Sequence, residues 1–146
     1  MTSYITTAEA DAIVAAIIPS TDPERATWEG LATADKAIFV DRAMLKIETL
    51  RFSGVAAVSF QETAFPRRGQ TEVPDEVKQA VALEAAAIAA YGEEAAQRER
   101  IQAQGITSFK AGNLSESYER RTRVTLLSST ASYLLTPFLA GVVPCV

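Results

Sequence analysis

The side chains that most often carry out catalysis or bind metals are scarce in this sequence. There is no histidine, and Cys145 is the single cysteine among 146 residues. This excludes serine or cysteine catalysis through histidine, and zinc sites built from histidine or several thiolates. No Gly-rich phosphate loop or paired-carboxylate motif is recognisable. The sequence therefore predicts a protein that is not an enzyme and holds no metal or cofactor.

Glu84 is the residue whose surroundings are most unusual. It is the one polar side chain in the apolar run between Gln79 and Tyr91. An isolated charge in such a run is costly, so it must be paired or reach solvent. We predict a buried or half-buried ion pair of Glu84 with Arg67, or alternatively with Arg42. In the other interpretation the loop that carries Arg67 is held by its apolar residues and its arginines are solvated.

A second group of charged residues follows a predicted hairpin. Residues 98–123 hold six basic and three acidic side chains in a chain of net charge −4. Arg120, Arg121 and Arg123 stand together in this segment. They suit an acidic partner surface or DNA, and ordinary surface charge is the alternative.

The last five residues form a third candidate site. They are Val142, Val143, Pro144, Cys145 and Val146, and none has a charged side chain. An apolar segment in water exposes area that docking would bury, at roughly 25 cal/mol per Å². We predict a docking arm at residues 142–146, with an unstructured end as the alternative.

Helices are expected to position these sites. Pro74 to Tyr91 has a proline suited to a first helical position, acids in the first turn and an almost wholly apolar continuation, which is typical of a central helix. Gly92 offers a stop or a bend, and a polar helical extension or a second short helix follows it. Residues 3–18 are predicted to form a short extended lead and then a helix, with Thr6 and Glu9 as its capping box, and further helices are predicted at about residues 34–51 and 129–139. Thr33 is the candidate N-cap of the helix at 34–51, and Ser128 or Ser129 that of the last one.

Two segments do not fit helical periodicity. Residues 52–73 read as a long loop for which Phe52, Phe60 and Phe65 are plausible anchors in the core. Gly112-Asn113 is a turn signal that predicts a β-hairpin over about residues 106–119. Trp28 lies in the connection before the second main helix. It is expected to pack against the domain and cover part of its surface, and a partner contact is the alternative.

These elements define a mainly α fold class. We expect a small helical bundle of about four to five helices, with a protruding β-hairpin and an extended C-terminal tail. Residues 1–141 would form one adaptor domain and residues 142–146 the docking tail. The acidic balance argues against a general nucleic-acid binder. No apolar run reaches about 18 residues, so no membrane span is predicted.

The order of several segments resembles a known family. The segments are SYITTAEADA, ADKAIFVDRA, QETAFPRRG, VPDEVKQAVALEAA, GITSFKAGNLSESY and LLTPFLAG. In this order and spacing they look like the head-tail connector (adaptor) proteins of tailed bacteriophages, some of which are labelled DnaT-like after a bacterial primosome protein. The resemblance covers nearly the whole chain.

The resemblance implies a structural role. The protein would bind the portal protein as a homo-dodecameric ring and join the capsid to a tail-side neck or terminator protein. DNA would pass through the channel without sequence-specific binding. The protein would be made in the host cytoplasm and end in the virion, at the head-tail junction. The alternative function is a single-stranded DNA-binding, DnaT-like module.

Overall fold

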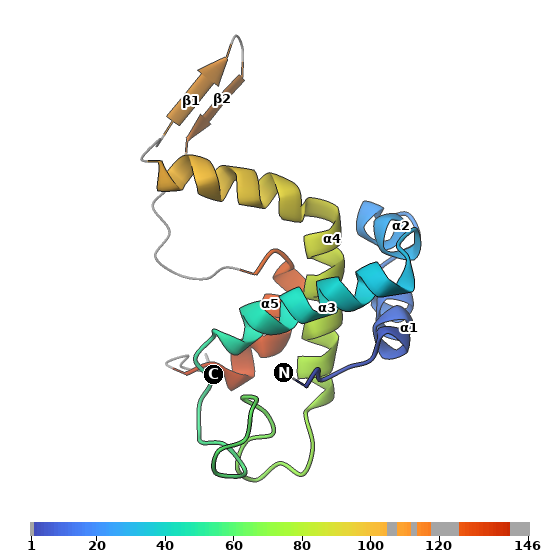
Figure 1. Ribbon diagram of the computed structural model, residues 1–146, viewed down its shortest axis with the longest axis vertical. Helices are drawn as coiled ribbons and strands as arrows, with labels where there is room; N and C mark the ends of the chain where they lie inside the picture. The colour runs from blue at the N-terminus through green and yellow to red at the C-terminus, as the bar shows by residue number, and fades with distance from the viewer. Residues whose placement is uncertain (1, 105–107, 112–113, 118–125, 141–146) are drawn as a thin grey trace.

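The computed structural model describes residues 2–104, 108–111, 114–117 and 126–140, which are mainly helical (Figure 1). The helices are α1 (Thr7–Ile17), α2 (Pro23–Glu29), α3 (Thr33–Glu48), α4 (Asp75–Ala103) and α5 (Ser129–Leu135), followed by the 3-10 helix η1 (Thr136–Phe138). The strands β1 (Ser108–Ala111) and β2 (Leu114–Ser117) pair antiparallel, with Ala111 opposite Leu114. The predicted class, a helical bundle with a hairpin, is confirmed. The predicted tail at 142–146 lies outside the described residues.

The first half of α4 is the centre of the bundle, as the sequence predicts. Every residue from Ala80 to Ile88 is buried, and α1, α2, α3 and α5 all pack against α4. Alanine occupies five of the nine positions in this stretch, which lets the surrounding helices approach closely. The largest fully buried side chains include Trp28, so the expectation that it fills the domain rather than contacting a partner agrees with the structure.

The observed N-cap residues of the helices agree only in part with the predicted ones. Thr6 caps α1 through a reciprocal capping box with Glu9, at 3.2 and 2.7 Å. For α3 the prediction was wrong: Ala32 is the N-cap, Thr33 is the first helical residue, and no side chain caps the helix. Asp35 in the first turn still supplies the negative charge that the helix dipole favours. Pro74 is likewise the N-cap of α4 and not its first helical residue.

Helix α4 does not stop at Gly92. The whole helix, Asp75–Ala103, has 29 residues and changes direction near its middle, so that its polar second half leads away from the other helices toward the hairpin (Figure 1). A Cβ atom at Gly92 would lie 3.1 Å from Cγ2 of Ile88, closer than an ordinary contact. Because glycine has no Cβ atom, Gly92 leaves room for the Ile88 side chain, and the helix continues through this position.

The loop at residues 52–73 has two aromatic anchors, not three. The buried rings of Phe52 and Phe65 meet edge to face with centroids 4.7 Å apart, and Phe138 meets Phe65 at 5.6 Å. Phe60, by contrast, is fully exposed, so its predicted role as an anchor is wrong. The chain after α5 closes onto the start of this loop, because the Ser53 amide donates to the Phe138 carbonyl at 2.8 Å.

Candidate interaction sites

Glu84 lies at the junction of three helices. Its Oε1 atom accepts hydrogen bonds from Lys46 Nζ at 2.9 Å and from the Leu127 amide at 3.0 Å. Its Oε2 atom accepts from the Ser128 amide at 2.9 Å. The carboxylate is completely buried, whereas the Lys46 side chain is 28% exposed. Glu84 therefore joins α4 to α3 and to the start of α5.

The predicted burial of Glu84 is correct, but the predicted partners are wrong. Lys46 pairs with Glu84 instead of Arg67 or Arg42. The guanidinium of Arg42 lies over the Phe39 ring, 5.7 Å from its centroid. The amides of residues 127 and 128 were also missed. Ser128 as a predicted helix cap was the available signal, since free amides at a helix start attract a carboxylate.

Arg67 has a different role, inside its own loop. Its guanidinium donates to the carbonyl oxygens of Phe52 at 3.0 Å, Ser53 at 3.1 Å, Gly54 at 2.8 Å and Ala64 at 3.2 Å. The planar fork of arginine can satisfy several acceptors at once, which a lysine cannot do in the same geometry. Arg67 therefore holds the two sides of the loop together instead of pairing with Glu84.

Tyr4 and Glu48 hold the same loop at residues 64 and 65. The Tyr4 hydroxyl donates to Glu48 and accepts from the Phe65 amide at 3.0 Å. Glu48 also accepts from the Ala64 amide at 2.8 Å. Burial, followed by the hydrogen bond to Glu48, raises the pKa of Tyr4 well above its usual value. The phenol is therefore neutral at ordinary pH and acts as a structural clamp.

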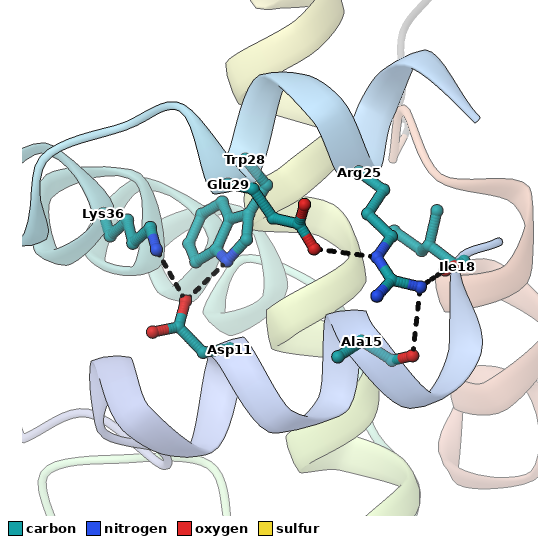
Figure 2. A network of polar contacts seen from close by, with 7 residues as sticks. All are labelled: Asp11, Ala15, Ile18, Arg25, Trp28, Glu29 and Lys36. Carbon is teal, nitrogen blue, oxygen red and sulfur yellow. Dashed lines mark hydrogen bonds and ion pairs between the residues drawn. The ribbon is translucent and has the colours of Figure 1, made fainter. Parts of the chain in front are cut away.

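A polar network ties α1, α2 and α3 together (Figure 2). Asp11 accepts from Trp28 Nε1 and from Lys36 Nζ, both at 2.9 Å. Arg25 donates to two carbonyl oxygens at the end of α1, at 3.1 and 3.4 Å. These contacts satisfy the polar edge of a buried indole and the free carbonyls of a helix end. These residues therefore stabilise the packing of α1, α2 and α3.

The arm is the name we give to the second half of α4 with the β1–β2 hairpin. In Figure 1 it extends beyond the other helices, with the hairpin at its far end. Within the described elements, the substantial contacts of β1 and β2 are with each other. The predicted partner residues Arg120, Arg121 and Arg123, and the tail residues Val142, Val143, Pro144, Cys145 and Val146, all lie outside the described residues.

An open apolar groove runs between α3 and the arm, with a volume of about 320 Å³. It is lined by Arg42, Leu45, Lys46, Ile88, Gly92, Ala95, Ala96, Glu99 and Leu127. The Leu45 side chain on its wall is mostly exposed, although the residue is large and apolar. We call this feature the arm groove.

Two further chemical properties of the described residues bear on function. No helix among them is long and apolar enough to cross a bilayer. In the same part of the chain, no cluster of three or more acidic, histidine or cysteine side chains could hold a metal ion.

The fold and these sites define a small α-helical protein with a buried structural ion pair and a protruding arm. A family model described as "Putative DnaT-like ssDNA binding protein" matches residues 1–144, and the chain belongs to this family. The match confirms the DnaT-like part of the resemblance read from the sequence. Searches of curated proteins and of solved structures gave no match.

Proposed function

We propose that this protein is a structural head-tail connector of a tailed bacteriophage, an adaptor without catalytic activity. It binds the portal as an oligomeric ring and joins the capsid to the tail. The observation that supports this most is the arm, which carries a two-stranded hairpin away from the bundle (Figure 1). A lone hairpin is marginal in water, so its position favours support from other molecules.

The composition of the arm supports the same function. Glu93, Glu94, Arg98 and Arg100 are all exposed on the second half of α4. A helix that is polar on most faces gains little by packing against its own bundle, and mixed charges suit contacts with neighbouring protein surfaces. The arm is therefore the natural place for contacts between copies of a ring or with the portal.

The proposal assigns partners to the remaining predicted sites. Arg120, Arg121 and Arg123 contact the portal, a neighbouring subunit or the DNA in the channel, and residues 142–146 dock on the portal or on an adjacent subunit. The assembled form is a homo-dodecamer that faces the tail-side neck or terminator protein. DNA passes through it without sequence-specific binding. The protein is made in the host cytoplasm and resides in the virion.

The test is attachment to the portal. Charge reversal by Arg120→Glu with Arg121→Glu should weaken portal attachment at least about tenfold, or about 1.4 kcal/mol. The control is Arg120→Lys with Arg121→Lys, which keeps both charges. Deletion of residues 142–146 should likewise abolish attachment while the helical circular dichroism signal is unchanged. If the wild-type protein does not attach to the portal in a pull-down, the connector function is wrong.

Single-stranded DNA binding is the second candidate, because the family description names it. This function needs aromatic platforms beside a basic groove. Tyr91 is an exposed aromatic of the bundle, but Asp22, Glu24 and Glu94 lie close enough to raise its pKa after the main effect, desolvation. Acidic neighbours repel phosphates, so the described surface around Tyr91 does not favour this function.

A salt titration separates the two functions. Binding of a labelled oligothymidine is measured by fluorescence anisotropy between about 50 and 200 mM salt, and each neutralised phosphate contributes a slope of about −0.7 for single strands. The connector function predicts weak binding. A micromolar or tighter complex at the higher salt, lost in Arg120→Glu with Arg121→Glu, would favour the DNA-binding function instead.

A further inference from the structure

Phe60 combines two properties that rarely occur together. Its side chain is fully exposed to solvent, and its backbone φ is 64°, in the left-handed region. This conformation is uncommon for residues other than glycine, asparagine and aspartate. A large aromatic side chain in this conformation and in water gains nothing from its own fold. Such an outlier points to a contact outside the molecule.

The loop around Phe60 is well braced. The Ala57 amide donates to the Pro66 carbonyl at 3.1 Å, and Gln61 Nε2 donates to the same carbonyl at 2.9 Å. The Val58 amide in turn donates to Gln61 Oε1 at 3.1 Å. Val58 is also largely exposed. We call the pair Val58 and Phe60 the loop knob. Because its backbone is held, docking the knob costs little conformational entropy.

The arm groove offers a matching surface on the same chain. Its apolar lining includes Leu45, Ile88 and the alanines at 95 and 96. A cavity of roughly 150 Å³ already accommodates benzene, so a groove of about 320 Å³ has room for the Phe60 ring and the Val58 side chain. In Figure 1 the loop at residues 52–73 lies below the helices, whereas the second half of α4 lies above them. A copy therefore does not fill its own groove.

We propose that the loop knob of one copy docks into the arm groove of a second copy of this chain. The inference deepens the proposed function, on which it rests for the assembly into a ring. Because knob and groove are different surfaces, the contact is head to tail and closes into a ring when the rotation allows.

The size of the contact predicts how assembly behaves. A phenylalanine buries roughly 150–250 Å², so even with Val58 one contact falls below the roughly 1,200 Å² of a stable interface. Two copies therefore associate weakly. A closed ring, in which each copy makes the contact twice, is stable. The assembled fraction should therefore rise steeply over a narrow range of protein concentration.

The first experiment removes the knob without straining the loop. Phe60→Asn is compatible with positive φ. In sedimentation velocity on the full-length chain, this variant should need about tenfold or more protein to assemble than the wild type does. Tyr133→Gln, which removes another exposed aromatic side chain, is the control and should assemble like the wild type. Leu45→Glu, on the groove wall, should have the same effect as Phe60→Asn.

The second experiment locates the contact. Phe60→benzoylphenylalanine is irradiated in the assembled protein, and cross-linked peptides are identified by mass spectrometry. Cross-links between two copies, from position 60 to residues 42–46 or 88–99, are expected. If Phe60→Asn assembles like the wild type, or the cross-links map elsewhere, the knob-in-groove contact is wrong while ring formation and portal binding stand. If the wild-type protein does not assemble at all, the inference and the proposed ring both fail.

Discussion

Glu84 illustrates how one buried charge organises several helices. Its two oxygens accept from one lysine and two backbone amides. Glu84→Gln keeps the shape but removes the charge and turns one acceptor into a donor. The buried carboxylate loses charge-assisted hydrogen bonds, whereas the partly exposed Lys46 can still reach solvent, so this change should reduce the free energy of unfolding by about 1.5–3 kcal/mol. Urea unfolding measures it.

The matched control is Glu93→Gln, on the exposed surface of the same helix. It should change the free energy of unfolding by less than about 0.5 kcal/mol. Equal stabilities of the two variants would show that Glu84 is not energetically important where the structure places it.

Tyr4 is expected to make the folded state less stable at alkaline pH. Its pKa is raised above the ordinary value of 10.0, first by burial and then by Glu48. The folded state therefore holds this proton more tightly than the unfolded state does. The resulting stability is complete below about pH 10 and is lost as the pH rises further.

Guanidinium unfolding at about pH 8 and about pH 11 tests this pH dependence. The wild-type protein should lose more free energy of unfolding between these two pH values than Tyr4→Phe, which has no phenol to ionise at this position. Parallel losses in both proteins would contradict the assignment.

At the scale of elements, the start of α5 depends on Ser128. Its hydroxyl accepts from the Ala131 amide at 3.2 Å, and the residue is buried. Ser128→Ala should lower the free energy of unfolding by about 1 kcal/mol, because a helix amide loses its cap while the backbone bond to Glu84 is kept. Ser129→Ala, at an exposed neighbouring position, should have little effect in the same chemical denaturation.

The loop at residues 52–73 depends on Arg67 in a comparable way. Arg67→Lys cannot reproduce the four bonds to carbonyl oxygens, so it should destabilise the protein by about 2–3 kcal/mol. Hydrogen exchange should become faster in this loop. The adjacent, exposed Arg68→Lys is the control. Unchanged exchange in Arg67→Lys would mean that other contacts hold the loop.

At the scale of the whole molecule, the bundle and the hairpin are separable. Replacing residues 106–119 by a Gly-Ser linker of equal length should shift the Tm of the helical bundle by less than about 3 °C, roughly 1 kcal/mol. The reason is that β1 and β2 have their substantial described contacts with each other. Circular dichroism measures the Tm. A loss of about 10 °C would show that the hairpin stabilises the bundle.

The sequence by itself determined the features that depend on neighbouring residues. The capping box of Thr6 and Glu9 uses residues three positions apart, and the central position of α4 follows from an apolar run that leaves no polar face. The burial of Glu84 follows from the same run. The hairpin is signalled by its two-residue turn. Each of these is a local pattern with one physical solution.

Only the tertiary structure decided which distant groups meet. Lys46 reaches Glu84 because of how α3 packs against α4, which no residue spacing expresses. Phe60 and Phe65 look alike in the sequence, but the bracing of the loop buries one ring and leaves the other in water. Contacts between residues far apart depend on the packing of whole elements, and local periodicity carries no information about that packing.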